Sequence, residues 1–274
     1  MPGMPPKGTR FYKLEALGND FVLIDARRSP LELDRRAIVE LSDRRCGIGF
    51  DQLLVLRDPN NDEQVARVEI HNADGTSAEQ CGNGMRAIAA WLEYLGRLKP
   101  RASLATPAGR VDLGLVSADT FSTDLPGPHA LETTEISATP PPVPARATDW
   151  ELVSTGNPHL VLLWPDEPGI DDLDRVAAAF AAREDWHNRV NIGLVHADTR
   201  QQAKLRVHER GAGPTLACGS GACAAAATLI RRGLCSSPVA IEQPGGRLVV
   251  HWQADSDRIV VQGPARVVFE GSIA

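Results

Sequence analysis

One short pattern occurs twice in the chain, and each copy precedes an apolar run long enough for a buried helix. The first copy is Cys81-Gly82-Asn83-Gly84, followed by residues 85–95, and the second is Cys218-Gly219-Ser220-Gly221, followed by residues 222–230. The positions of the two cysteines differ by half the length of the chain (218 − 81 = 137). A strand-to-helix turn repeated in each half predicts a duplicated fold with two homologous lobes.

Positions beyond the two turns keep the same spacing. Gly96, which closes the first helix, and Gly233, which closes the second, are separated by the same offset (233 − 96 = 137), as are Pro107 and Pro244. At the outer turns of each half this offset changes only to 138 and to 136. Unrelated glycine-rich turns would not keep a common register, so this spacing supports a true duplication.

The predicted fold class is α+β. Each central helix is apolar on nearly all sides, so it should be enclosed by sheet rather than lie on a surface. Each lobe is therefore expected to be a mainly antiparallel, barrel-like sheet wrapped around its helix, with the active site in the cleft between the lobes. Residues 1–127 form the predicted N-terminal lobe, with the C-terminal strand 265–274 as a candidate addition, and residues 128–264 form the C-terminal lobe.

Shorter periodic segments supply the rest of each lobe. Gly18-Asn19-Asp20 is interpreted as a turn between strands, and the proline-rich stretch 126–144 as a linker or a crossing between the lobes. Two further helices are predicted at 31–41 and 171–182. The predicted strands are 21–25, 53–56, 65–70, 110–116, 120–125, 160–164, 189–195, 204–207, 248–252, 259–262 and 265–269.

Composition excludes several classes of protein. The chain has 29 basic and 35 acidic residues and no basic stripe interleaved with aromatics, so no nucleic-acid partner is expected. No run of 18 apolar residues and no apolar leader occurs, so we expect a cytoplasmic protein without a membrane segment. The five cysteines are an odd number without Cys-x-x-Cys spacing, so free thiols are expected rather than disulfides or a zinc site.

The two repeated cysteines are the candidate reactive groups. Each should sit at a helix start, where free N–H groups and the helix dipole attract anions and lower the pKa of a thiol. Cys81 and Cys218 on opposite walls of a cleft could reach a planar carbanion from both faces, one thiolate removing a proton and the other thiol returning one. Backbone N–H groups at Gly82-Asn83 and Gly219-Ser220 could hold the substrate carboxylate, without a metal or cofactor.

A blander interpretation is a tight turn in which each cysteine is a small buried apolar residue. That interpretation is preferred for Cys46, Cys223 and Cys235, whereas duplication favours function for Cys81 and Cys218. His159 and Glu209 are candidates to tune the thiols because each ends a polar segment of the second half. The residues alone leave two roles open, a turn or surface role and a binding role, for Asn19, Asn72, Asn157, Asn191 and Arg210.

Six segments of the sequence resemble the diaminopimelate epimerase family over nearly the whole chain. This family comprises cofactor-independent isomerases of bacterial lysine biosynthesis that interconvert LL- and meso-diaminopimelate. The segments are LGNDFVLID (17–25), GIGFDQ (47–52), NADGTSAEQCGNGMR (72–86), GNPH (156–159), VNIG (190–193) and ERGAGPTLACGSGACA (209–224).

The resemblance implies specific roles for these residues. Cys81 and Cys218 would be the acid and base, with His159 and Glu209 modulating their thiols, and Arg210 would pair with the distal carboxylate of the substrate. It also implies a homodimer without a cofactor, with diaminopimelate as its small-molecule substrate. The implied substrate contacts are Asn19, Gln52, Asn72, Gly82, Asn83, Asn157, Asn191, Arg210, Gly219 and Ser220.

The chain departs from the family pattern at few positions. Ser220 stands where threonine is usual and Pro214 where glutamate is common, and Phe269 lies where the family has an aromatic dimer contact. The leader before Phe11 is longer than usual and is predicted to be a disordered extension.

Five other interpretations fit parts of the pattern less well, and one of them is a non-catalytic binding protein. A proline racemase typically has histidine in place of Asn83, and a phenazine-type isomerase has a carboxylate in place of the thiols. A thiol redox protein would use the two cysteines as a switchable disulfide. A pyridoxal-phosphate racemase needs a Schiff-base lysine, and none of the four lysines has a convincing phosphate-binding context.

Overall fold

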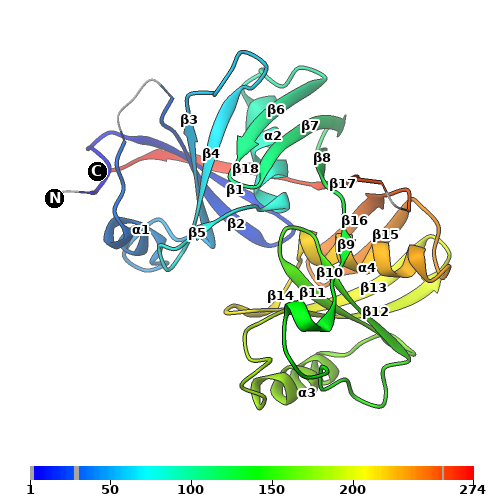
Figure 1. The fold of residues 1–274 in the computed structure, drawn as a ribbon. Helices are drawn as coiled ribbons and strands as arrows, with labels where there is room; N and C mark the ends of the chain where they lie inside the picture. Colours follow the sequence, from blue (N-terminus) through cyan, green and yellow to red (C-terminus); the bar gives the residue numbers. More distant parts are fainter. Residues whose placement is uncertain (1–2, 28–30, 255) are drawn as a thin grey trace. The chain divides into compact units, whose positions relative to one another are not determined.

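The computed structural model of the chain describes residues 3–27, 31–254 and 256–274 (Figure 1). It divides into two compact units, residues 1–125 with 262–274, and residues 126–261. The first unit therefore includes the C-terminal strand, and the second includes the stretch 126–144 that the sequence suggested as a linker. Strands predominate over helices in both units, which confirms the α+β prediction.

In the first unit, a mixed sheet begins with three antiparallel strands, in the order β18, β1 and β2. β2 then pairs in parallel with β3, β3 with β4 antiparallel, β4 with β6 in parallel, and β6, β7 and β8 antiparallel. The strands are β1 (Arg10–Ala16), β2 (Asn19–Asp25), β3 (Gln52–Arg57), β4 (Ala66–Asn72), β5 (Ser77–Ala78), β6 (Arg101–Thr106), β7 (Gly109–Ser117), β8 (Thr120–Pro126) and β18 (Arg266–Ser272).

Helix α2 (Gly82–Tyr94) is the buried centre of this unit and contacts β1, β2, β7 and β18. Its middle is mainly apolar, with Met85, Ala87 and Ile88 all inaccessible to solvent, and it also buries Arg86. The sequence predicted a helix from residue 85, but the helix starts at Gly82 because Cys81 caps it. A second helix, α1 (Arg35–Ser42), is capped by Asp34; the prediction for 31–41 partly coincides with it.

The second unit repeats this plan around helix α4 (Gly219–Arg231), which contacts β10 to β13, β15 and β16. Helix α3 (Ile170–Ala181) packs on β12 and β13, and a short 3-10 turn covers Thr133–Glu135. The strands are β9 (His129–Ala130), β10 (Asp149–Ser154), β11 (Pro158–Leu163), β12 (Asn191–Thr199), β13 (Gln202–Glu209), β14 (Gly213–Thr215), β15 (Val239–Gln243), β16 (Gly246–His251) and β17 (Arg258–Pro264).

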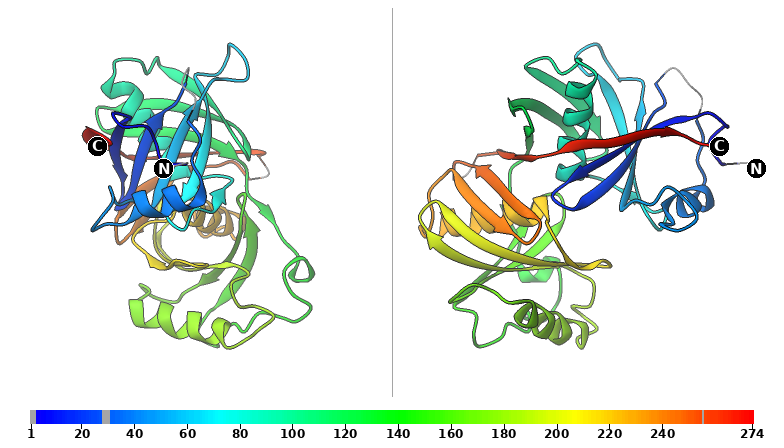
Figure 2. Two further views of the ribbon diagram at one scale, coloured as in Figure 1. Left: turned by 90° about the vertical axis from the view of Figure 1, so that its left-hand side faces the viewer. Right: turned by 180° about the vertical axis from the view of Figure 1, so that it is seen from behind.

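Strand pairing supports the duplication inferred from spacing. Ala66 pairs with Leu104 in the parallel ladder of β4 and β6, and Ala203 pairs with Ile241 in that of β13 and β15. Both members of the second pair follow those of the first by the offset that separates the two cysteines. In Figure 2, the two views show each central helix against the strands of its own unit.

Three local predictions were wrong. Leu17 and Gly18, both with positive φ, form the first hairpin turn, and Asn19 already belongs to β2. The stretch 126–144 contains a strand and a 3-10 turn rather than a plain linker. The leader is ordered from residue 3, since Pro5 is buried and Gly8 N donates to Ile273 O at 2.7 Å; residues 1–2 lie outside the described part.

Candidate functional site

Cys218 is the N-cap residue of α4 and is 4% exposed. Its sulfur accepts a hydrogen bond from Gly221 N at 3.3 Å and lies 3.4 Å from Ser220 Oγ. The helix therefore begins by satisfying a backbone donor with a thiol, as Ser or Asp side chains do elsewhere. This geometry aims the sulfur at the first turn of the helix.

Glycine is required at position 221 by close approach rather than by backbone conformation. A Cβ there would lie 3.0 Å from Val207 Cγ2 and 3.3 Å from both Cys218 Sγ and Cβ. The helix start thus packs closely against β13, which explains the second glycine of the repeated pattern.

His159, on β11, is 1% exposed and contacts the same turn. Its Nε2 lies 3.0 Å from Ser220 Oγ, 3.0 Å from Asn157 Oδ1 and 3.4 Å from Asn191 Nδ2. Burial and the nearby charge of Arg210 lower the pKa of His159 to about 3. The imidazole is therefore neutral at physiological pH, and Ser220 connects it to Cys218.

Glu209 ends β13 beside this cluster, and Arg210 follows it. Asn191 Oδ1 accepts a hydrogen bond from Arg210 N at 3.0 Å, and Thr215 Oγ1 donates to Glu209 Oε1 at 2.8 Å. The pairing of Ile192 with His208 sets this proximity, because it brings the start of β12 to the end of β13. The Arg210 side chain is exposed, so its guanidinium is accessible to a ligand.

The pKa of the Cys218 thiol is raised well above its ordinary value. Burial is the main cause and the charge of Glu209 adds to it, while hydrogen bonds from Ser220 and Gly221 N act in the opposite direction. The prediction that a helix start would lower this pKa was therefore wrong in its net sign. The helix does favour the thiolate, but burial next to a carboxylate outweighs it.

Cys81 repeats the same arrangement in the first unit. It is the N-cap of α2, and its sulfur accepts a hydrogen bond from Gly84 N at 3.3 Å, but it is only half-buried. A Cβ on Gly84 would lie 3.3 Å from Leu54 Cδ2 and 3.4 Å from Phe21 Cε1. The helix start therefore lies over β2 and β3.

Three of the predicted binding amides lie at this end of the sheet. Gln52 pairs with Phe21 on one side and with Asn72 on the other, and Asn19 begins β2. Gln52 Nε2 donates to Asn72 Oδ1 at 2.9 Å. Gln52 Oε1 is buried and has no protein partner among the described residues, so it is a ready acceptor for a ligand donor.

Asn83 follows Cys81 and turns its side chain inward. It is 4% exposed and accepts a hydrogen bond from Arg86 Nη2 at 2.6 Å, and Arg86 is itself fully buried. The side chain of Asn83 thus anchors the turn, which leaves its backbone as the group that could meet a ligand.

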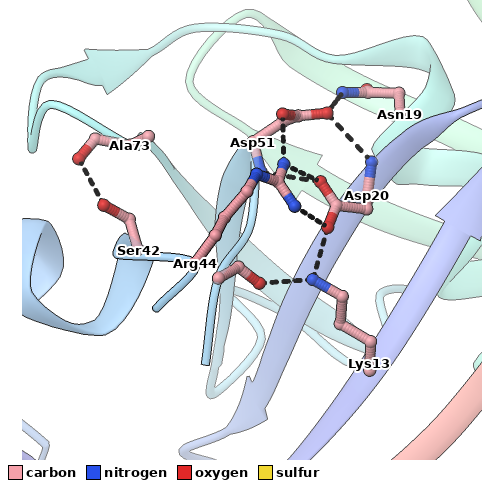
Figure 3. Close-up of polar contacts among 8 residues, drawn as sticks. Lys13, Asn19, Asp20, Ser42, Arg44, Asp51 and Ala73 are labelled. Atoms are coloured by element: carbon pink, nitrogen blue, oxygen red, sulfur yellow. Dashed lines mark hydrogen bonds and ion pairs between the residues drawn. The ribbon is translucent and has the colours of Figure 1, made fainter. Parts of the chain in front are cut away.

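An ionic network behind Asn19 was not anticipated from the sequence. Figure 3 shows Arg44 lying between Asp20 and Asp51, with Lys13 on the far side of Asp20. Arg44 donates to Asp20 Oδ2 at 2.9 Å, to Asp20 Oδ1 at 2.7 Å and to Asp51 Oδ1 at 2.8 Å, and Asn19 Nδ2 donates to Asp51 Oδ2 at 2.9 Å.

The charge of this network is balanced around Asp20. Burial alone would raise the Asp20 pKa, but hydrogen bonds from Arg44 and Lys13 outweigh it and hold that pKa well below its usual range. Asp20 and Asp51 also exchange hydrogen bonds through their backbone N–H groups, at 3.0 and 3.1 Å. The network therefore ties the start of β2 to the segment before β3 and orients the Asn19 amide. In the sequence, the network is indicated only by the two acidic residues, Asp20 and Asp51, at the start of β2 and just before β3.

Each predicted site residue thus belongs to one of two groups, one in each unit. The first unit brings together Asn19, Gln52, Asn72, Cys81, Gly82 and Asn83, and the second brings together Asn157, His159, Asn191, Glu209, Arg210, Cys218, Gly219 and Ser220. Among the described residues, no group of three or more His, Cys, Asp or Glu side chains could hold a metal ion. No helix in that part of the chain is long and apolar enough to span a membrane.

Sequence comparison gives consistent matches over nearly the full length. The family profile described as diaminopimelate epimerase matches residues 11–125 and 151–268. The diaminopimelate epimerase of Azoarcus sp. is 40% identical, with 96% of this chain and 98% of the relative covered. The diaminopimelate epimerase of Alkalilimnicola ehrlichii is 38% identical with the same coverage, and the O-ureido-serine racemase of Streptomyces lavendulae is 37% identical, with 97% and 96% covered.

Solved structures share the fold at low sequence identity. A phenazine biosynthesis protein of the PhzF family from Bacillus anthracis superposes with a TM-score of 0.73 at 15% identity, covering 98% of this chain and all of that one. A probable proline racemase from Agrobacterium radiobacter also gives 0.73, at 12% identity, covering 97% and 92%. At this level of sequence identity, these matches show a shared fold alone.

Proposed function

Because this chain belongs to the diaminopimelate epimerase family and is an isomerase, we propose that it interconverts LL- and meso-2,6-diaminopimelate. In this proposal the reaction proceeds by two-cysteine proton transfer without a cofactor, in the cytoplasm, as a step of lysine biosynthesis. One observation carries the mechanism: each half of the duplication presents a cysteine as the N-cap of its buried helix, with the sulfur 3.3 Å from a helix N–H.

Proton transfer would use the two thiols from opposite faces of the substrate α-carbon. One thiolate removes the α-proton, and the other thiol donates a proton to the opposite face, which inverts the centre. The negative charge that develops on the carboxylate would be met by backbone N–H groups of Gly82, Asn83, Gly219 and Ser220 at the two helix starts.

Cys218 would hold its proton in the free enzyme, because burial and Glu209 raise its pKa. Substrate binding would change this balance, since the substrate ammonium group near Glu209 would offset the carboxylate charge. His159 would act as a neutral hydrogen-bonding group rather than as a cation, because its pKa is lowered to about 3.

Substrate choice would depend on Arg210. An exposed guanidinium beside the cysteine cluster suits a second carboxylate at the far end of the substrate, which it can bind through two parallel hydrogen bonds. A second candidate function follows from the relative named O-ureido-serine racemase. A ureido group has no carboxylate for Arg210, so we favour diaminopimelate. Turnover rates with both substrates decide between the two.

The main test is incubation of the purified protein with LL-diaminopimelate in heavy water, without added cofactor. We expect deuterium at the α-carbon as the meso isomer appears, and loss of both signals in Cys81→Ala and in Cys218→Ala with the fold retained. Near-normal epimerisation by either variant would refute the two-base assignment.

A homodimer is a further part of the proposal. Strand β18 exposes Val268 and Phe269, each at 49%, and Phe269 contacts Phe11 edge to face at 6.2 Å between ring centroids. An exposed apolar pair on a strand favours contact with a second copy. Light scattering should give the mass of a dimer for the wild type and of a monomer for Phe269→Glu; a monomeric wild type would contradict the proposal.

A further inference from the structure

Gln243 contacts Cys218, although Gln243 comes well after Cys218 in the sequence. It is the last residue of β15 and is 9% exposed. Its Oε1 accepts a hydrogen bond from Cys218 N at 2.8 Å. Its Nε2 is buried and has no hydrogen-bond partner among the described residues.

The turn after Gln243 fixes where this side chain starts. Gln243 pairs with Gly246, and Gly245 N donates to Leu216 O at 2.7 Å, so the turn is tied directly to the segment before Cys218. The equivalent turn of the first unit is tied in the same way, by Ala108 N donating to Glu79 O at 3.2 Å. The two turns are thus structurally equivalent.

The side chains at the end of the two strands differ. Thr106 occupies the position equivalent to Gln243, at the same offset as the two cysteines, and its hydroxyl donates to Gly109 O within its own turn at 2.8 Å. Thr106 therefore supports the turn, whereas Gln243 reaches past the turn to the cysteine. The added contact is a feature of the second unit.

Building on the proposed function, we propose that Gln243 is a positioning residue for Cys218. The N-cap backbone of Cys218 is extended, with φ −125° and ψ 113°, and its N–H lies outside the helix ladder. Anchoring that N–H on the Gln243 amide limits rotation of the N-cap residue, and with it the direction in which the sulfur points. Hydrogen bonding of the N–H by a buried side chain also spares the cost of an unpaired buried donor.

Two substitutions at this position separate positioning from general stability. Gln243→Leu removes the acceptor and should lower kcat by about tenfold, the upper range for one hydrogen bond, with little change in KM. Gln243→Glu keeps an acceptor of the same reach but adds negative charge beside the thiol. It should retain the maximal kcat, with the rising limb of the pH profile moved to higher pH.

The matched control is Thr106→Val, which removes the equivalent hydroxyl of the first unit and should leave kcat and its pH profile unchanged. An independent readout is the rate of Cys218 alkylation by iodoacetamide against pH, followed by peptide mass spectrometry. It should change in Gln243→Leu and stay as in the wild type in Thr106→Val.

The outcomes distinguish the two proposals. If the wild type fails to epimerise diaminopimelate but Gln243→Leu still alters Cys218 alkylation, the proposed function fails and the positioning role stands. If Gln243→Leu keeps the wild-type kcat, pH profile and Cys218 alkylation rate, the positioning role is overturned. An equal loss in Thr106→Val would overturn it as well, because the effect would then belong to the turn.

Discussion

The glycine that follows each cysteine by three positions offers a sharp test of how tightly the two helix starts are held. Gly221→Ala places a methyl group 3.0 Å from Val207 Cγ2 and 3.3 Å from Cys218 Sγ, both buried. Gly84→Ala is the matched variant, because its methyl group would meet Leu54 Cδ2 at 3.3 Å and Phe21 Cε1 at 3.4 Å. The two changes are chemically identical and occupy equivalent positions.

Two opposing effects set the size of the response. Replacing glycine by alanine in a helix gains up to about 1 kcal/mol, whereas an extra methyl group in a well-packed core costs about 1–3 kcal/mol. Leu54 meets the new methyl group with the end of a flexible side chain, so Gly84→Ala should be close to neutral. Val207 is β-branched and stiff, so Gly221→Ala should be less stable than Gly84→Ala by about 1–2 kcal/mol.

Activity should respond more strongly than stability. The methyl group at position 221 would push the Cys218 sulfur, and displacement of a reacting atom by a fraction of an ångström can cost about tenfold in rate. Urea denaturation followed by circular dichroism gives the stability difference, and proton exchange in heavy water gives the rate. If Gly221→Ala proves as stable and as active as Gly84→Ala, the close contact between helix start and β13 does not constrain the sulfur.

Three further predictions follow from charge and burial. Because the His159 pKa is lowered to about 3, the unfolded chain binds a proton below pH 6.5 that the folded chain does not. The free energy of unfolding should therefore fall by up to about 1.4 kcal/mol per pH unit from pH 6.5 downward. Urea midpoints measured against pH should show a smaller slope in His159→Gln. Cys81 is half-buried and Cys218 is 4% exposed with a raised pKa, so iodoacetamide at pH 7.5 should modify Cys81 before Cys218. Peptide mass spectrometry gives the order, and the reverse order would contradict the burial argument. Arg44→Leu leaves Asp20 and Asp51 without their shared cation. KM should rise severalfold, and the melting temperature should fall by only a few degrees. An unchanged KM would mean that the network does not orient Asn19.

The local geometry of the cysteine turns could be predicted from the sequence because it depends on neighbouring residues. A small polar residue, two glycines and an apolar run determine an N-cap and a buried helix. Strands β6 and β15 were missed for the opposite reason. Each is a short segment after a proline that pairs antiparallel with the following strand, β7 or β16. Each also pairs in parallel with β4 or β13, a partner on the far side of the central helix in the sequence. No local pattern encodes such a partner.

The electrostatics of the site could not be predicted from the sequence. The helix start at Cys218 does favour the thiolate, as expected, but burial and Glu209 reverse the net effect. Both come from tertiary structure, since β13 brings Glu209 and the core excludes water. The role of Gln243 could not be predicted either, because its contact with Cys218 also comes from tertiary structure. That contact depends on the turn after β15, which is hydrogen-bonded to Leu216.

The duplication has kept the backbone of the two halves and changed the side chains around each sulfur. Equivalent turns are tied by equivalent backbone hydrogen bonds, yet Cys218 has a carboxylate and a buried amide beside it, whereas Cys81 is half-buried. The two thiols therefore lie in different surroundings. The proposed reaction interconverts diastereomers and does not need matched thiols, because LL- and meso-diaminopimelate are not mirror images and their α-protons need not be equally acidic. The asymmetry is therefore compatible with a two-base reaction, in which each cysteine accepts a proton from one isomer and donates one to the other.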